Sequence, residues 1–412
     1  MSGRHADLLR RAYPGALAKL HAATRSLHDA EDALHDAIAR ALDVWPREGV
    51  PEVPEAWLVA VALNRHRDRA RRRAVAARHE GALAALAEMS PWARAAMGEL
   101  RFARGWKDEL LGLLFACCDP ALAPGEAAAL ALTTVVGLST EEAARAFLVA
   151  PRSMEQRLTR ARQRLRERSP GDAPSPDASA DRLDAVLRAL YLLFNEGYWS
   201  GDDEAPIRAD LCALAVGLTR SLAEVAAEAP EVRGLLAVLL LHDARRPARL
   251  DAGGAPVPLP DQDRSRWDRA AVTAAVALLD DALAERKPGP FQVEAAIAAV
   301  HCRAPTAEAT DWREIEALYG LLESMRPTST VRAQRAFATA RAEGVAAGLA
   351  MIEAGGAADE APLVYGALLA EAGRDDEARR QLTRALDEAR NRHERAQIAA
   401  RLAALTDGRD TT

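Results

Sequence analysis

The chain of 412 residues contains little lysine, few aromatic residues and no long apolar run. Only three of its 54 basic residues are lysine, and aromatic residues make up 4% of the chain. No Gly-Lys-Ser/Thr triplet occurs, which excludes a P-loop NTPase. The longest apolar run, Gly234 to Leu241, is too short to span a bilayer, and the charged first residues are unlike a signal peptide. These absences predict a cytoplasmic protein without a membrane segment.

Cysteine and metal-binding patterns are also sparse. Cys117, Cys118, Cys212 and Cys302 show no CxxC spacing, which is typical of reduced thiols in a cytosol. We expect the adjacent pair, Cys117 and Cys118, to pack in a core rather than to act as a thiol sensor. No complete set of metal ligands or cofactor-binding residues stands out, so we expect neither a metal nor a cofactor.

The residues that are abundant favour helices. Hydrophobic residues make up 49% of the chain, enough to give each domain a buried core. Because alanine and leucine are common and aromatic residues are few, we expect an all-α fold. Residues 1–170 carry 26 basic against 21 acidic residues, a net charge of +5, whereas residues 171–412 carry 28 against 39, a net charge of −11. The basic part is therefore the one expected to meet an anionic polymer.

Composition also divides the chain into domains. The stretch from Ser169 to Ala180 contains three prolines and three serines, which is typical of a linker, and a weaker break lies between Gly81 and Gly105. The segment from Asp251 to Pro260 is predicted to be a loop or a short hairpin. We expect domains at residues 8–80, 106–168, 182–284 and 285–408, with linkers at 81–105 and 169–181.

The last part of the chain has the spacing of helical hairpins. Residues 361–372 and 376–389 are two helix-like segments joined by a short turn at Gly373. Ala346 precedes Ala378 by 32 residues, which is close to the tetratricopeptide (TPR) period of about 34 residues. TPR-like helical repeats are one interpretation, and unrelated amphipathic helices in a bundle are the other.

The first clear amphipathic segment runs from about residue 27 to residue 42. Apolar residues recur on one face at steps of three and four: Leu27, Ala30, Leu34, Ile38 and Ala41. Acidic residues gather on another part of the segment: Asp29, Glu31, Asp32 and Asp36. An acidic helix face of this kind is either solvated or a docking surface for another protein.

A basic helix is predicted after a loop rich in proline. The loop is expected from Trp45 to Pro54, and the helix from Glu55 to Arg73 contains six arginines but a single aspartate in its last nine residues. Asn64, Asp68 and Arg71 share one face at i, i+4 and i+7. Because a solvated helix normally interleaves acids with its arginines, this pattern favours contact with nucleic acid.

A complete helix-turn-helix surrounds a second basic helix. A supporting helix is expected from Pro124 to Val136, Ser139 and Glu142 form a capping box for the next helix, and Pro151 begins the last one. Met154, Leu158, Ala161 and Leu165 are predicted to face inward. The residues predicted to face outward are polar: Arg152, Ser153, Gln156, Arg157, Arg160 and Arg164. A basic second helix of this kind fits the major groove of DNA.

In order, spacing and composition these motifs resemble an extracytoplasmic-function (group IV) RNA polymerase sigma factor. Asp29-Ala-Glu-Asp32, Trp57-Leu58 and Asn64-x-x-x-Asp68-x-x-Arg71-Arg72 resemble sigma region 2, and Arg157-Leu-x-Arg160-Ala-Arg162-x-x-Leu165 resembles the end of region 4. The resemblance covers about residues 8–168. Trp45-Pro46, Phe115-Ala-Cys-Cys118 and the segment from Leu190 to Tyr198 are similar to the subfamily that has a long, TPR-like C-terminal extension.

The resemblance implies a non-enzymatic factor of two small helical sigma domains and a helical C-terminal domain. Such a factor binds core RNA polymerase and promoter DNA and directs transcription initiation, and its extension is expected to regulate it through contact with the sigma module. The implied polymerase-binding residues are Asp29, Glu31, Asp32 and Asp36. The implied minus-ten residues are Trp45, Asn64, Arg65, Asp68, Arg71 and Arg72. The implied minus-thirty-five residues are Arg152, Ser153, Gln156, Arg157, Arg160 and Arg164.

Two other functions remain open from the residues alone. The chain is a TPR-type scaffold or adaptor without promoter activity if its helix-turn-helix only packs. An enzyme would use the cluster of His242 and Asp243 with Asp261 and Asp263. The His-Asp dipeptide is typical of metal-dependent phosphohydrolases, but the further ligands of such a site do not stand out. Pairing between arginine and aspartate is the alternative explanation of this cluster.

Overall fold

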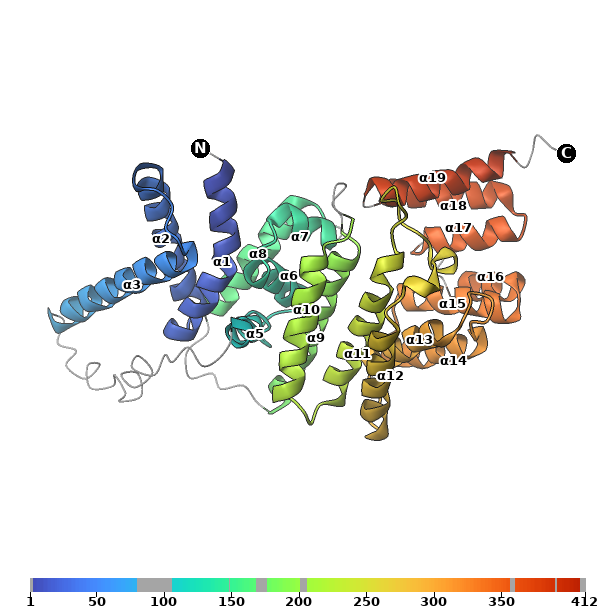
Figure 1. Ribbon diagram of the computed structural model, residues 1–412, viewed down its shortest axis with the longest axis horizontal. Coiled ribbons are helices and arrows are strands. Elements are labelled where there is room, and N and C mark those ends of the chain that lie inside the picture. Colours follow the sequence, from blue (N-terminus) through green and yellow to red (C-terminus); the bar gives the residue numbers. More distant parts are fainter. Residues whose placement is uncertain are drawn as a thin grey trace. The chain divides into compact units, whose positions relative to one another are not determined.

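The computed structural model describes residues 3–79, 106–147, 149–167, 176–200, 206–355, 360–389 and 391–407. Across these ranges the regular elements are helices, apart from one isolated bridge, so the predicted all-α fold is confirmed. None of the described helices is long and apolar enough to cross a membrane. The chain divides into two compact units, Met1–Leu193 and Phe194–Thr412 (Figure 1).

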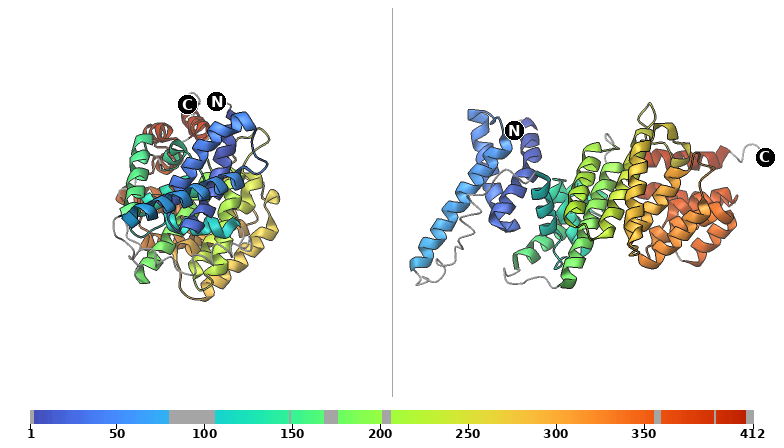
Figure 2. Two further views of the ribbon diagram at one scale, coloured as in Figure 1. Left: turned by 90° about the vertical axis from the view of Figure 1, so that its left-hand side faces the viewer. Right: turned by 60° about the horizontal axis from the view of Figure 1, so that its bottom comes forward.

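Three long helices form the N-terminal part of the first unit. Helices α1 (Gly3–Thr24), α2 (Leu27–Glu48) and α3 (Pro54–His79) each contact the other two. Their shared core is built of fully buried leucines: Leu17, Leu20, Leu34 and Leu58. The second half of α3 extends beyond α1 and α2 (Figure 2).

Helix α2 is longer than the sequence predicts. The Ser26 hydroxyl accepts a hydrogen bond from the Asp29 N–H (3.2 Å) and so caps the helix at its start. The helix then runs through Pro46 to Glu48, so the loop predicted from Trp45 begins only at Gly49, and that boundary is wrong. Pro46 lies in the last turn, where little of the helix follows it, and the burial of Trp45 (2% exposed) holds this turn against the core. Gly49, with a φ of +90°, then ends the helix.

Four shorter helices follow in the first unit. They are α5 (Trp106–Cys117), α6 (Pro124–Val135), α7 (Thr140–Ala146) and α8 (Pro151–Glu167). The predicted capping box of α7 is confirmed, because the Ser139 hydroxyl accepts from the Glu142 N–H (3.1 Å) and Glu142 accepts from the Ser139 N–H (2.6 Å). Helix α8 packs on both α6 and α7, which completes the helix-turn-helix. The predicted linker at 81–105 lies outside the described residues.

Helix α9 (Pro176–Tyr198) starts inside the linker predicted at 169–181, which corrects the end of that linker. Pro176 is at the first helical position, where its missing N–H loses no hydrogen bond. Arg182 of this helix donates a hydrogen bond to Asp119, in the turn after α5 (2.7 Å). Because Asp119 is buried, this ion pair attaches the start of α9 to the first unit.

Helix α11 (Pro230–Arg245) is the central helix of the second unit. It contacts α10 (Ala209–Val225), α12 (Arg269–Ala284) and α13 (Pro290–Arg303). A helix that is surrounded in this way must be apolar on all sides. This explains the longest apolar run of the sequence, from Gly234 to Leu241, which is almost wholly buried here.

The loop between α11 and α12 contains a short hairpin, as the sequence predicts. Leu250 and Pro256 form an antiparallel bridge, and the Asp251 N–H donates to the Ala255 carbonyl (2.9 Å). Three short 3₁₀ turns flank the hairpin: η1 (Arg246–Ala248), η2 (Leu259–Asp261) and η3 (Arg264–Arg266).

The C-terminal part of the second unit is a succession of helices, each in contact with the next. They are α14 (Trp312–Met325), α15 (Ser329–Glu343), α16 (Val345–Ala354), α17 (Pro362–Glu371), α18 (Asp375–Glu388) and α19 (Arg392–Asp407). Helices α17 and α18 form the predicted hairpin, with Gly373 at a φ of +72° in its turn. The assignment of these hairpins to the TPR class stays a prediction.

The contact between α11 and α13 predicts that Gly234 is essential for stability. A Cβ at Gly234 would lie 2.6 Å from Gln292 Cγ and 2.8 Å from the Gln292 backbone nitrogen. We expect Gly234→Ala to lower the free energy of unfolding by about 1–3 kcal/mol, because the crowded partner includes backbone. The matched control is Gly112→Ala in α5, where nothing lies within 4 Å. This control should raise stability by about 0.5–1 kcal/mol in the same urea titration, and a stabilised Gly234→Ala chain would contradict the packing.

Candidate nucleic-acid interface

Helix α8 has one apolar and one basic face, as its spacing predicts. Met154, Leu158 and Ala161 are buried at 4% exposure or less, and Leu165 is half-buried. The exposed side chains of the helix include five of the six predicted minus-thirty-five residues: Arg152, Ser153, Gln156, Arg160 and Arg164. The buried residues fasten the helix to α6 and α7, and so they fix which side chains face outward.

Arg157, the sixth of these residues, is half-buried. Its guanidinium lies over the ring of Phe147, at the end of α7, 5.4 Å from the ring centroid. A cation–π contact of this kind stabilises the packing of α7 against α8. Arg157 therefore has a structural role in the helix-turn-helix that its outward position in the sequence pattern does not reveal.

Arg164 is paired with a carboxylate of the supporting helix. Its Nη1 lies 2.5 Å from Oε2 of Glu126, a buried residue of α6. Glu126 Oε2 also accepts a hydrogen bond from the Ala123 N–H at the start of α6 (3.1 Å). Because this pair already neutralises Arg164, the better candidates for DNA contact are Arg152 and Arg160, which have no carboxylate partner among the described residues.

A buried ion pair joins the acidic helix to the basic one. Arg162 Nε of α8 donates to Glu31 Oε1 of α2 at 3.1 Å, and Glu31 is only 4% exposed. The prediction that Glu31 contacts polymerase is therefore corrected, since its carboxylate is held inside the first unit. One feature of the sequence indicates that Arg162 lies next to the buried face of α8. It follows Ala161 and lies four residues after Leu158, at the border of the apolar stripe.

The phenol of Tyr13 and the buried thiol of Cys117 lie near this ion pair, and Cys118 is buried next to Cys117. Burial, and then the charge of Glu31, raises the pKa of Tyr13 well above its ordinary value. Burial likewise raises the pKa of Cys117, and that of Cys118 to about 12. Both thiols are therefore protonated at neutral pH, and the prediction that they pack in a core is confirmed.

The other three acidic residues of α2 remain on the surface. Asp29, Asp32 and Asp36 are each half-exposed. Asp32 lies 3.6 Å from Nδ1 of His28, and Asp36 lies 3.7 Å from Nη1 of Arg65 on α3. The structure thus leaves an acidic surface of Asp29, Asp32 and Asp36, without Glu31.

The predicted minus-ten residues are divided between surface and core. Asn64 and Arg65 of α3 are exposed, whereas the side chains of Asp68, Arg71 and Arg72 lie outside the described residues. Trp45 is buried and meets Trp57 edge-to-face, with ring centroids 5.6 Å apart. The prediction that Trp45 contacts a base is therefore corrected: it continues the apolar stripe of α2, four residues after Ala41.

The turn that precedes α3 is the segment from Gly49 to Val53. It connects α2 to α3, and it exposes the apolar side chains of Val50 (36%) and Val53 (58%). Sequence reasoning included this segment in its loop but did not single out the valines, whose exposure depends on where α2 ends.

Comparison with known families identifies the helix-turn-helix. Residues 115–165 match the family model for sigma-70, region 4. Residues 182–283 match a family of unknown function, DUF6596. An uncharacterized protein of Rhizobium meliloti (strain 1021) is 42% identical over 398 residues, which cover 95% of this chain and 93% of the relative. The chain belongs to the same family as this relative. No solved structure matches the chain.

Region 4 gives the general role of the chain. It supports a sigma-factor family, whose members recognise promoters with RNA polymerase, and it points to a factor that acts by binding. The predicted recognition surface of α8 lies within the matched residues, so Arg152, Ser153, Gln156 and Arg160 are exposed residues of region 4.

The residues of the alternative enzymatic site have structural partners. Nδ1 of His242 lies 2.6 Å from Nη2 of Arg245, and Asp243 accepts from Arg246 Nε (2.8 Å). Burial, followed by the nearby arginines, lowers the pKa of His242 well below its usual value. Asp263 caps η3 by accepting from Ser265 (2.9 Å), and Asp261 is exposed. Within the described ranges, no three His, Cys, Asp or Glu residues are placed to hold a metal.

The Glu31–Arg162 pair generates a prediction about the first unit. We expect Arg162→Met to lower the free energy of unfolding by about 1–3 kcal/mol, because Glu31 stays buried without its cation. This loss is at the lower end of what breaking a buried ion pair costs, because a third of the Arg162 side chain is exposed to solvent.

A double-mutant cycle tests this prediction. Glu31→Leu combined with Arg162→Met removes both charges, so the doubly substituted chain should lose less stability than the sum of the two single losses. Urea unfolding of all four chains measures the coupling. Strictly additive losses would show that the two side chains do not stabilise each other.

Proposed function

We propose that the chain is an extracytoplasmic-function sigma factor that binds core RNA polymerase and directs it to promoters, with its second unit regulating this activity. The observation that carries the proposal is the exposed face of α8. A helix-turn-helix places its second helix in the major groove, with the N-terminal residues of that helix at the base edges. Arg152, Ser153 and Gln156 are in this part of α8 and are exposed.

The chemistry of this face suits the minus-thirty-five element. Arginine donates two parallel hydrogen bonds to guanine, and glutamine can pair in the same way with adenine. Arg160 lies two turns further along α8 and is exposed, within reach of either a base edge or a phosphate. Binding by such arginines weakens with salt, because each phosphate contact releases counterions.

We assign the minus-ten element to the exposed residues of the α2–α3 hairpin. Asn64 and Arg65 are at the start of the basic part of α3, and Val50 and Val53 are in the turn that precedes α3. A base extruded from a weak duplex needs an apolar surface and hydrogen-bonding groups nearby. The turn from Gly49 to Val53 therefore replaces Trp45 as the element that we expect to meet the base. Asp68, Arg71 and Arg72 stay proposed contacts of the opened strand.

The acidic surface of α2 is the proposed polymerase contact. Asp29, Asp32 and Asp36 are half-exposed, and the contacts of Asp32 with His28 and of Asp36 with Arg65 lie at the surface. Surface ion pairs contribute about 0–1 kcal/mol, so a partner with a basic surface can displace them at small cost.

Promoter binding requires α2 and α8 to separate. The two promoter elements are named for positions about 25 base pairs apart, which corresponds to about 85 Å of duplex. The Glu31–Arg162 pair holds α2 and α8 in direct contact, so the two helices cannot reach both elements in this arrangement. We infer that core polymerase separates them when it binds, and that it does so in the cytoplasm, where polymerase works.

The first test is a run-off transcription assay with core polymerase, a promoter and the full chain. Arg160→Ala should weaken promoter binding by about 1–3 kcal/mol if it contacts a base edge, with a matching loss of transcript. Arg220→Ala, which removes an exposed arginine from α10, is the matched control and should behave as the unchanged chain. If Arg160→Ala and Arg220→Ala leave the same footprint, α8 does not enter the groove.

The role of the second unit is tested in the same assay. It belongs to the acidic part of the chain, net −11 over residues 171–412, and its covalent connection to the first unit through α9 raises its effective concentration near the basic part. We expect a chain that ends after Leu193, and so keeps the Arg182–Asp119 pair, to differ from the full chain in transcript yield. Equal transcript yields from the shortened and the full chain, at equal concentration, would contradict a regulatory role of the second unit.

A further inference from the structure

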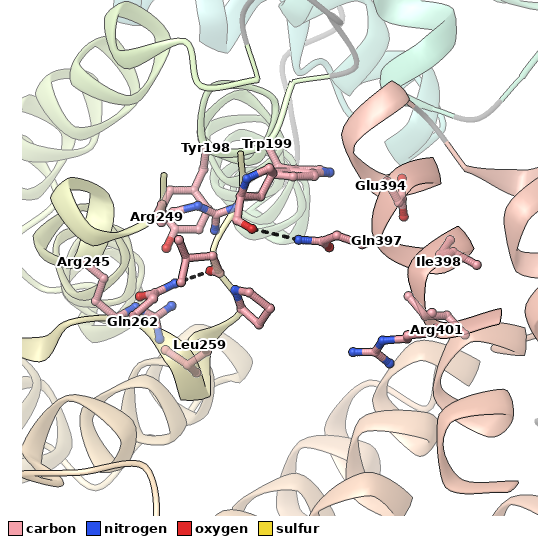
Figure 3. A pocket seen from close by; sticks show the side chains of 14 residues that line it. Tyr198, Trp199, Arg245, Arg249, Leu259, Gln262, Glu394, Gln397, Ile398 and Arg401 are labelled. Carbon is pink, nitrogen blue, oxygen red and sulfur yellow. Dashed lines mark hydrogen bonds between the residues drawn. The ribbon is translucent and has the colours of Figure 1, made fainter. Parts of the chain in front are cut away.

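The second unit contains a cavity of about 270 Å³ that neither promoter recognition nor polymerase binding uses. One wall comes from the end of α9, the end of α11 and the hairpin loop after it, and the other wall comes from α17 and α19 (Figure 3). Two hydrogen bonds hold α19 in place. Asn391 donates to the Ser200 carbonyl (2.8 Å), and Gln397 donates across the cavity to the Pro256 carbonyl (3.0 Å). The cavity is therefore built into the fold.

The cavity wall is positively charged. Arg245, Arg249 and Arg401 line it, and Glu394 is the only carboxylate among its lining residues. Glu394 is on α19, across the cavity from Arg245 (Figure 3). This positive charge also affects the adjacent His242. Burial, and then the charges of Arg245 and Arg249, lower the pKa of its imidazole.

Two of these arginines hold unused donors in fixed positions. Arg245 is 6% exposed, and its buried Nε has no hydrogen-bond partner. The guanidinium carbon of Arg249 lies over Tyr198, 3.9 Å from the ring centroid, and its buried Nε is also unpaired. A buried polar atom without a partner costs about 1–3 kcal/mol, so an acceptor that reaches these donors would remove that cost. The stacking on Tyr198 keeps the Arg249 guanidinium from turning away.

An unused acceptor lies on the same wall. Gln262 is 8% exposed, and its Nε2 donates to the Val257 carbonyl (3.1 Å). Its Oε1 is buried and has no partner. The remaining lining is apolar and includes Leu259, Leu363 and Ile398. The cavity thus combines cationic donors, one neutral acceptor and an apolar floor.

We propose that this cavity is a binding site for a small organic anion. The carboxylate or phosphate group of the ligand binds Arg245 and Arg249, which supply charge-assisted hydrogen bonds. The apolar body of the ligand packs on Leu259 and Ile398. The volume limits the ligand to a small molecule, at the lower end of the range for ligand pockets. The site belongs to the second unit alone, so ligand binding requires neither DNA nor polymerase.

Calorimetric titration of the full chain tests the site. The probes are benzoate and phenyl phosphate, with benzamide as the uncharged match for benzoate. We expect at least one of the two anions to bind saturably, and benzamide to bind at least about tenfold more weakly than benzoate where benzoate binds. Binding of one anion alone identifies its head group as the ligand class. No saturable binding of either anion up to about 10 mM, ten times a Kd of about 1 mM, would overturn the proposal.

Variants locate the binding in this cavity. For the anion that binds, Arg249→Gln should lower the affinity by about tenfold or more, as expected for the loss of one charged hydrogen-bond partner. Gln262→Glu places a carboxylate on the same wall of the cavity as Arg245 and should lower the affinity for the same anion by a similar factor. Arg313→Gln, an exposed arginine of α14, is the matched control and should bind as the unchanged chain.

The variants also provide the contrary outcomes. Circular dichroism verifies the fold of each chain, and if one cavity variant unfolds, the other decides. Unchanged affinity in the folded cavity variants, an equal loss in Arg313→Gln, or benzamide binding as tightly as benzoate would each contradict an anion site at Arg245 and Arg249.

Discussion

The ion pair between Glu31 and Arg162 connects the two helices that carry the proposed binding surfaces of the first unit. Glu31 belongs to the helix whose other face is acidic, and Arg162 belongs to the helix whose other face is basic. Because Glu31 is buried, the pair is stable only while α2 and α8 stay together, and its separation leaves a carboxylate to be solvated. This contact therefore opposes the separation of α2 and α8 that we propose for promoter binding. Any partner that separates α2 from α8 must supply the free energy that breaking this buried ion pair costs.

Arginine has three different roles in this chain, which has almost no lysine. In the first unit, Arg157 stacks on an aromatic ring and Arg164 pairs with a helix-capping glutamate, so both stabilise the helix-turn-helix. In the C-terminal helices, Arg335 of α15 donates hydrogen bonds to two glutamates of α14, Glu316 and Glu323, and so joins the two helices. In the cavity, Arg245 and Arg249 have no such carboxylate. The planar guanidinium suits all three, because it can stack, pair in two directions and remain charged when buried.

Local signals of the sequence predicted the helix-turn-helix well. The capping box of Ser139 and Glu142 joins each side chain to the backbone of the other, three residues away, so the box can be read from the local sequence. The buried stripe of Met154, Leu158 and Ala161 follows from helical spacing alone. The prediction failed at Trp45, because this residue was placed in the proline-rich loop rather than in the last turn of α2. The contact of Trp45 with Trp57 outweighs the one hydrogen bond that the proline removes.

By itself the sequence determined that the chain is helical, where the helices of the helix-turn-helix begin, and that the last of these helices is basic on one side. These properties depend on neighbours within one or two turns, so composition, caps and periodicity report them directly. Only the tertiary structure decided which charged residues are available. Glu31, Arg164 and Arg249 each resemble exposed polar residues in the sequence, yet they meet Arg162, Glu126 and Tyr198, far away along the chain. Helical periodicity places a side chain on a face, but whether that face meets water, a counter-ion or a cavity depends on distant segments that the local pattern does not contain.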